Sequence, residues 1–142
     1  PHPSLARYTP YLAIELARGL RKAADQELRE AGFTWPDFLV LTIVTAVDGL
    51  AQEAVCDRTG VDRSTVSGIT RDLEHEGLLD RRNDGLDGRQ VTCFATPAGA
   101  AAAAEAARAM DRTARTQLRL LDTRERARLH ALLARALGAR RA

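Results

Sequence analysis

Hydroxyl and guanidinium side chains gather in one short stretch near the middle of the chain. They are Arg63, Ser64, Thr65, Ser67 and Arg71. A hydroxyl group can donate and accept hydrogen bonds, and a guanidinium group presents a planar set of donors that suits phosphate oxygens and the edge of guanine. Side chains of these types, placed on one surface, suit hydrogen bonding to a nucleic acid.

A helix must position these side chains. Val66, Ile69 and Leu73 recur at helical spacing and predict a buried side that faces the preceding helix, with the polar residues outward. Asp62 or Ser64 can cap the start of this helix. A solvated helix face has the same composition, so this helix alone fits both a binding surface and an ordinary exposed surface.

A second short helix and a hairpin flank this polar helix. Residues 51–59 are predicted to be helical and to end at Gly60, so that two helices and a tight turn form a helix-turn-helix. Two Asp-Gly pairs within residues 84–88 predict a hairpin loop. The alternation of Val91, Cys93 and Ala95 then predicts a half-buried strand.

The predicted hairpin loop carries Asp87 and Arg89 two residues apart. A carboxylate can hold a guanidinium extended, and an oriented Arg on a projecting loop fits a narrow minor groove. Arg81 and Arg82 at the hairpin base are phosphate contacts or plain surface charge. The stretch therefore predicts a helix in the major groove of DNA and a loop in the neighbouring minor groove. The predicted DNA-binding residues are Arg63, Ser64, Thr65, Ser67, Arg71, Arg82, Asp87 and Arg89.

Longer helices are predicted on both sides of this unit, over residues 9–31, 34–47 and 96–121, with a sixth helix capped by Thr123. The fold class is mainly α with a small β wing, comprising about six helices and a two- or three-stranded hairpin. We divide the chain into an N-terminal dimerisation helix (1–32), a winged helix-turn-helix DNA-binding lobe (33–96) and C-terminal dimerisation helices (97–142).

The outer helices carry long apolar stripes, such as the one formed by Leu129, Leu132, Leu133, Ala136 and Leu137. A chain of 142 residues cannot easily hide all of these stripes internally. We therefore expect a homodimer. The alternative is that these helices cover the core of their own chain.

Composition narrows the class of protein further. The chain is 45% hydrophobic with a net charge of +2, it has no apolar run long enough to span a bilayer, and no secretion signal is visible. Two cysteines, Cys56 and Cys93, are too few for an oxidised scaffold of this size, so we expect a cytoplasmic protein.

The chain resembles the MarR family of winged-helix transcriptional regulators over nearly its whole length. No single segment is specific, but their order and spacing together are. The resembling segments are residues 33–41 (start of the second helix), 49–61 (first motif helix), 62–79 (recognition helix and its exit), Asp87-Gly88-Arg89 with Thr96-Pro97-Ala98-Gly99 (wing and start of the fifth helix) and 121–133 (last dimerisation helix).

The resemblance implies a homodimer on a pseudo-palindromic DNA operator, associated with the nucleoid of a bacterium or archaeon when bound. It implies repression in most cases, relieved by a small ligand or by oxidation. Three residues depart from the family pattern. Gly68 and Gly88 stand where larger or basic residues are common, and Ala51 replaces a hydroxyl cap.

Five of the six aromatic residues precede residue 40. The resemblance implies a ligand cleft near the first, second and fifth helices. We assign Tyr8, Tyr11, Trp35 and Phe38 to a site for an aromatic or acyl effector, while a packed hinge between the first two helices is the alternative reading.

Other functions have weaker support in the sequence. Redox sensing is an alternative, but both cysteines are predicted to be buried and neither lies near the first helix, where the family's oxidation sensors carry theirs. Cys56, Cys93 and His75 lack the spacing of a metal site. No cofactor is expected, and no arrangement typical of an enzyme is found. A winged-helix module that binds protein, or an architectural DNA-binding protein, remains a further alternative.

Overall fold

The computed structural model describes residues 2–83 and 90–138, and within these ranges the chain forms six α-helices and three short strands. The architecture is mainly α with a small sheet, as the sequence predicted. In chain order the elements are α1 (Thr9–Glu30), α2 (Trp35–Ala46), β1 (Leu50–Ala51), α3 (Gln52–Thr59), α4 (Arg63–His75), β2 (Leu79–Asn83), β3 (Val91–Ala95), α5 (Pro97–Gln117) and α6 (Thr123–Ala136).

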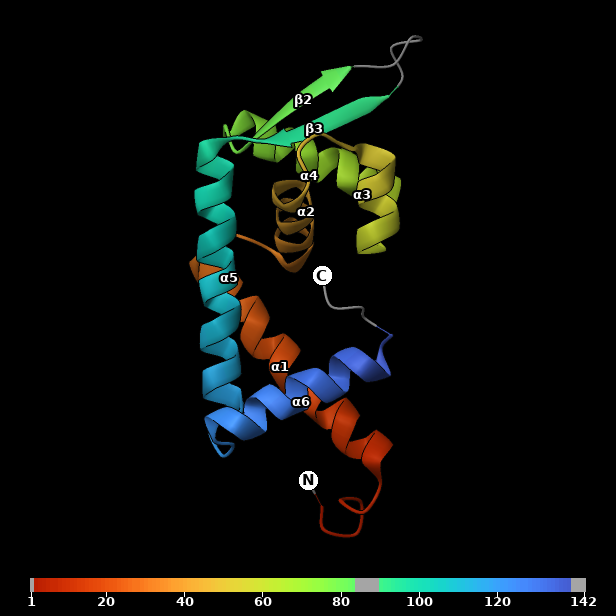
Figure 1. The fold of residues 1–142 in the computed structure, drawn as a ribbon, viewed down its shortest axis with the longest axis vertical. Helices are drawn as coiled ribbons and strands as arrows, with labels where there is room; N and C mark the ends of the chain where they lie inside the picture. The colour runs from red at the N-terminus through yellow and green to blue at the C-terminus, as the bar shows by residue number, and fades with distance from the viewer. Residues whose placement is uncertain (1, 84–89, 139–142) are drawn as a thin grey trace.

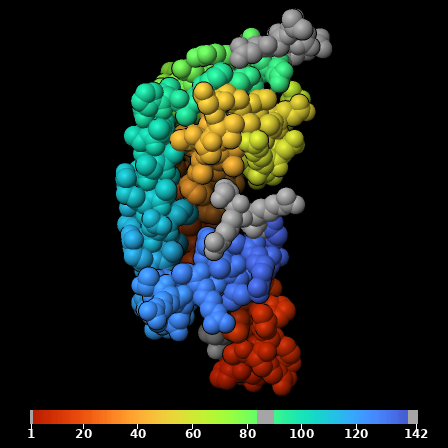
Figure 2. All heavy atoms as spheres, viewed as in Figure 1, coloured from red at the N-terminus to blue at the C-terminus, as the bar shows by residue number. Residues whose placement is uncertain are grey.

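A lobe of α2, α3, α4 and the sheet occupies one end of the molecule (Figure 1). Helix α5 leaves the sheet and runs along one side to the opposite end, and α1 packs against it. Figure 2 shows α5 as a continuous wall on that side, with α6 and the N-terminal residues at the end far from the sheet. The lobe is thus mounted on a frame of long helices.

Helix boundaries follow from capping side chains. Thr34 and Asp37 form a reciprocal capping box at the start of α2, and the Thr96 hydroxyl accepts a hydrogen bond from the backbone N–H of Gly99 at 3.0 Å. The prediction that Thr123 caps α6 is wrong, because the Asp122 carboxylate accepts the backbone N–H of Glu125 at 2.9 Å and Thr123 is the first helical residue. Helix α5 ends at Gln117, four residues before the predicted boundary at 121, because residues 118–121 form the turn into that cap.

The three strands form an antiparallel sheet in the order β1-β3-β2. Cys93 of β3 pairs with Leu50 of β1 on one side and with Arg81 of β2 on the other. The two-residue strand β1 settles the predicted choice between two and three strands. It ties the segment before α3 to the wing.

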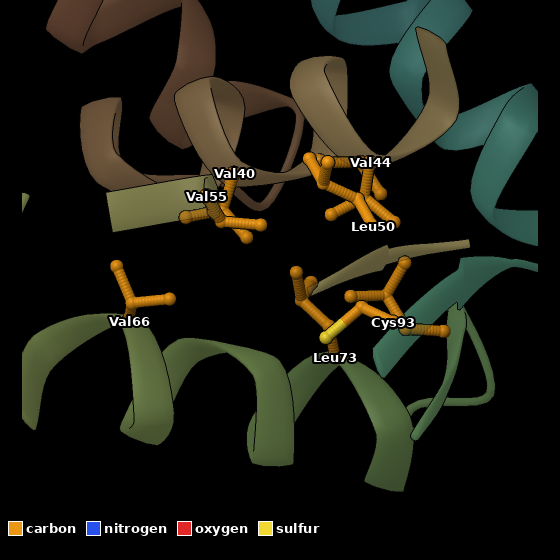
Figure 3. Packing of buried hydrophobic residues seen from close by; sticks show 9 residues of the cluster. Val40, Val44, Leu50, Val55, Val66, Leu73 and Cys93 are labelled. Carbon is orange, nitrogen blue, oxygen red and sulfur yellow. The ribbon is translucent and has the colours of Figure 1, made fainter. Parts of the chain in front are cut away.

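The main core lies where α2, α3, α4 and the sheet meet. Val66, Thr70 and Leu73 of α4 are buried, and Figure 3 shows Val66 and Leu73 pointing from α4 toward the side chains opposite. Thr70 replaces Ile69 in the predicted buried set, since Ile69 is only partly buried. The fully or nearly fully buried members are Val40, Leu41, Val44, Leu50, Val55, Val66, Leu73, Leu79 and Cys93.

A smaller core of Leu28, Ala106 and Ala109 joins α1 to α5. The small side chains of α5 allow this close approach. By contrast, no residue of α6 is buried, so its predicted apolar stripe does not cover the core of its own chain.

The start of α5 packs closely against Leu78, just before β2, and a substitution can test this contact. A methyl group built on Gly99 would lie 2.0 Å from the carbonyl oxygen of Leu78, which also accepts the Thr96 backbone N–H at 3.1 Å. We expect Gly99→Ala to lower the free energy of unfolding by about 1–3 kcal/mol in urea titrations at fixed protein concentration, because backbone must move to admit the methyl group.

Gly68→Ala is the matched control for this substitution. Beyond its own helix, a methyl group at Gly68 would meet no atom of the described residues within 4 Å, so helix propensity alone should raise stability by up to about 1 kcal/mol. Unchanged stability of Gly99→Ala would contradict the close packing of α5 on Leu78.

Candidate nucleic-acid interface

The predicted polar face of α4 lies on the surface of the lobe. Arg63, Ser64, Thr65 and Arg71 are exposed and Ser67 is half-buried, because the apolar side of the helix is fixed in the core. Arg71 turns its Nε–H back to the carbonyl oxygen of Ser67 at 3.1 Å. The structure therefore brings these five predicted residues together on one helix surface.

Asp62 organises the start of this helix. One carboxylate oxygen accepts the backbone N–H of Thr65 at 3.0 Å and the Ser64 hydroxyl at 2.7 Å. The other oxygen accepts the Thr65 hydroxyl at 2.6 Å. These bonds, led by that of the Thr65 hydroxyl, hold the pKa of Asp62 well below its usual value. Of the two residues predicted to cap α4, Asp62 is the cap in the structure. Its lowered pKa keeps the carboxylate ionised near neutral pH.

A groove of about 800 Å³ lies between the first turns of α3 and α4 and the wing strands. Seven of the eight residues that line it are polar or charged, and three of the predicted residues, Arg63, Ser64 and Ser67, lie on the α4 side. The groove is lined by Gln52, Glu53, Arg63, Ser64, Ser67, Arg81, Gln90 and Val91.

Sequence reasoning missed the contribution of α3 to this groove. Gln52 and Glu53 stand in the first turn of α3, and the Gln52 side-chain carbonyl accepts the hydroxyl of buried Thr70 at 3.3 Å. This bond links the first turn of α3 to α4. In the sequence, the one sign of this contact is Thr70 on the inward side of α4, because a buried hydroxyl needs a hydrogen-bond partner from a neighbouring element.

Arg81 and Arg82 point to opposite faces of the wing. Arg81 shares the core face with Cys93 and lines the groove; its backbone N–H and side chain contact the Glu74 carboxylate at 3.0 and 3.4 Å. The Arg82 guanidinium lies 4.4 Å from the ring centre of Phe94 on the other face. The alternation of side chains along β2 could have indicated that Arg81, rather than Arg82, faces α4.

The predicted wing-tip residues Asp87 and Arg89 lie outside the described residues, as does Gly88. Gly68 lies on the outer side of α4, one turn after Ser64, and the packing of the chain does not require a glycine there. The five residues on α4 and Arg82 are therefore the predicted DNA contacts that the structure places.

The structure divides the four predicted effector residues into two groups. The rings of Trp35 and Phe38 lie 5.5 Å apart at the start of α2. Tyr8 is exposed at the beginning of α1, and Tyr11 lies about 15 Å along that helix from Arg21, which packs on Trp35. Within one chain, Tyr8 and Tyr11 do not share a site with the other two.

Trp35 opens onto a hollow of about 380 Å³ between α1, α2 and α5. The Arg21 guanidinium lies 4.6 Å from the Trp35 ring centre, and the buried Thr113 hydroxyl has no hydrogen-bond partner in the described part of the chain. The lining residues are Ala17, Leu20, Arg21, Ala24, Trp35, Met110, Thr113 and Ala114. Phe38 faces a neighbouring hollow that shares Met110.

The cysteines are separate thiols in different elements. Cys93 is buried, and this burial raises the pKa of its thiol, while Cys56 is half-buried on α3. Among residues 2–83 and 90–138, no group of three or more His, Cys, Asp or Glu side chains could hold a metal ion. No helix in these ranges is long and apolar enough to cross a membrane.

Comparison with known proteins agrees with this geometry. Residues 31–90 match the model of the MarR family, and the chain belongs to this family of transcriptional regulators. The HTH-type transcriptional regulator TtmR of Methylorubrum extorquens is 33% identical over 83 residues, which cover 58% of this chain. The matched stretch spans only 43% of TtmR.

Two solved structures illustrate the likeness in fold. The PcaV transcriptional regulator of Streptomyces coelicolor, in complex with its natural ligand, is 30% identical over 95% of both chains with a TM-score of 0.71. A MarR family protein of Mycobacterium tuberculosis in complex with DNA is 19% identical, with a TM-score of 0.78, over 91% of this chain and 97% of that one. At 19% identity the second comparison shows the shared fold alone.

Arg63 lines the groove, whereas Arg82 lies on the opposite face of the wing, and this difference leads to a prediction about salt dependence. We expect Arg63→Gln to reduce the slope of log affinity for duplex DNA against log salt by about 0.9, because one phosphate-neutralising charge is lost from the groove. Arg82→Gln removes a charge that is also exposed and should leave the slope nearly unchanged. Fluorescence anisotropy over a salt series measures both slopes. Equal losses would instead favour the sequence-based assignment of Arg82 as a phosphate contact.

Proposed function

We propose that this MarR-family regulator is a cytoplasmic homodimer that represses transcription by binding a pseudo-palindromic DNA operator and leaves it when a small aromatic or acyl ligand binds. The observation that carries the proposal is the polar groove between α4 and the wing. It combines the exposed cation Arg63 with the hydroxyl groups of α4, on a helix whose other side is buried, and also contains Glu53 and Arg81, the latter paired with Glu74. Such a surface suits base edges in the major groove and the phosphates beside them.

Exposed apolar side chains support the proposed dimer. Among the described residues, every large exposed apolar side chain lies outside the lobe of residues 33–96. They are Leu5, Tyr8, Leu12, Ile14, Leu120, Leu132, Leu133 and Leu137. Exposed apolar area of this kind favours association, and a second copy would bring the same helices together with two-fold symmetry. This is the basis for treating residues 1–32 and 97–142 as the dimerisation region.

The hollow beside Trp35 supports the proposed effector site. Arg21 offers a guanidinium at its wall, whose Nε–H donates to Asp25 at 3.0 Å, and the Thr113 hydroxyl, unpartnered among the described residues, offers a hydrogen-bonding group inside it. The remaining lining is largely apolar, so an aromatic or acyl carboxylate has complementary chemistry. PcaV, which is 30% identical to this chain, was solved with its natural ligand bound, and this supports a ligand-responsive role here. Tyr8 and Tyr11 would join this site only from the second subunit of the dimer.

Redox control receives less support than ligand control. A reactive thiol needs an exposed setting that favours the thiolate, whereas burial of Cys93 favours its neutral form. A role as an architectural DNA-binding protein uses the same surface and differs in selectivity, so binding measurements separate the two functions.

The proposed function is tested by the affinity and stoichiometry of DNA binding. We expect the purified protein to sediment as a dimer, and one dimer to bind duplex DNA from upstream of its own gene at least about a thousandfold more tightly than a composition-matched random duplex. Equal affinity for both duplexes would support the architectural role instead. A monomer in solution and on DNA would contradict the proposed two-fold arrangement.

The proposed effector site has an internal optical probe, because Trp35 is the only Trp in the chain. We expect simple aromatic carboxylates to change Trp35 fluorescence and to release DNA, and Arg21→Gln to weaken this response about tenfold by removing the cation. Arg18→Gln is the matched control, since Arg18 is an exposed cation on the same helix that pairs with Glu15, as Arg21 pairs with Asp25, but does not line the hollow.

Thr113→Val provides an independent check of the same site. Removal of a buried hydroxyl without a partner should leave the free protein as stable or more stable, while weakening the ligand. A ligand that releases DNA with no change in Trp35 fluorescence and full activity on Arg21→Gln would place the effector site elsewhere.

A further inference from the structure

We infer that Asp62 sets the hydrogen-bond polarity of the α4 hydroxyls, so that Ser64 and Thr65 read donor groups on base edges and Asp62 is an indirect determinant of sequence specificity. This inference rests on the proposed placement of α4 in the major groove of DNA. It concerns which bases are chosen there rather than whether DNA binds.

The two hydroxyl groups at the start of α4 have no hydrogen left to donate to DNA. A hydroxyl group has one hydrogen to donate and two lone pairs to accept. The Ser64 hydroxyl donates to one Asp62 oxygen at 2.7 Å, and the Thr65 hydroxyl donates to the other at 2.6 Å. Both hydrogens are thus committed to a carboxylate within the protein, and only lone pairs face outward from these exposed side chains.

Lone pairs select particular bases. In the major groove cytosine presents only the N4 amino donor, whereas guanine and thymine present only acceptors, and adenine presents one of each. A hydroxyl that can only accept therefore favours cytosine or adenine and disfavours guanine and thymine. The neighbouring Arg63, which can only donate, has the opposite preference, so the first turn of α4 carries both polarities side by side.

The two Asp62 oxygens accept different hydrogen bonds, and this difference allows the contact with the Thr65 hydroxyl to be changed without removing the helix cap. The oxygen that accepts the Ser64 hydroxyl also accepts the Thr65 backbone N–H at 3.0 Å and caps the helix. The second oxygen accepts only the Thr65 hydroxyl among the described residues. In Asp62→Asn the amide oxygen can keep the first position, because Asn is as good a cap as Asp.

The amide nitrogen of Asp62→Asn then takes the second position and donates to the Thr65 hydroxyl oxygen. The Thr65 hydroxyl then accepts one bond within the protein and keeps its hydrogen and one lone pair, so toward DNA it can donate as well as accept. The Ser64 hydroxyl can still donate to the amide oxygen, so its polarity toward DNA stays the same. Ser64 therefore serves as an internal control within the same helix turn.

The experiment is selection of bound sequences from a randomised duplex library by four proteins: the parent chain, Asp62→Asn, Thr65→Val and the double variant. Circular dichroism and dimer sedimentation verify that each variant is folded. We expect one position in each half-site to favour cytosine or adenine in the parent and to admit guanine or thymine in Asp62→Asn, with the relative enrichment of these two bases raised about tenfold. Thr65→Val should abolish the preference at that position in both backgrounds.

Two results would overturn the inference while leaving the proposed function intact. One is an unchanged base preference in Asp62→Asn when Thr65→Val loses it, since polarity would then not depend on Asp62. The other is an unchanged preference in Thr65→Val, since Thr65 would then not read a base. Failure of the parent chain to enrich any sequence would overturn the proposed function itself.

Discussion

The structure depends most on the burial of one side of α4. Val66 and Leu73 pack in the core with residues of α2, α3 and the wing strand that carries Cys93 (Figure 3), and buried Thr70 donates to Gln52 of α3. Because a helix has a fixed angular spacing, burial of these three positions determines where every other side chain of α4 points. Arg63, Ser64 and Arg71 are exposed as a consequence. The polar surface is therefore as rigid as the core beneath it, which is what preorganised recognition requires.

Helix α2 connects this core with the hollow proposed for an effector. Trp35 stands at the start of α2 beside the hollow, while Val40 and Val44 of the same helix pack in the core that holds α4. At the other end of the lobe, Thr96 and Gly99 attach α5 to the carbonyl oxygen of Leu78 just before β2. A ligand in this hollow would contact α2, which belongs to the lobe, and also α1 and α5, the long helices that carry the lobe (Figure 1).

Local signals in the sequence were sufficient for most of the fold. Thr34, Asp62 and Thr96 mark helix starts because their side chains accept backbone N–H groups three residues on, and these bonds need no tertiary information. The start of α6 was misplaced by one residue because Asp122 and Thr123 are both good caps. The groove was less predictable. Gln52, Glu53 and Gln90 come together only after α3 and the wing pack beside α4, and nothing in their local sequence distinguishes them from solvated residues.

In the proposed complex, α4 meets the major groove of DNA twice, once in each half of a symmetric dimer. Methylation interference on a selected duplex can detect both contacts, because dimethyl sulfate modifies guanine N7 in the major groove and adenine N3 in the minor groove. We predict that N7 methylation blocks binding in two patches centred about one helical turn, or about 10 base pairs, apart. Interference confined to adenine N3, or found in a single major-groove patch, would contradict the account.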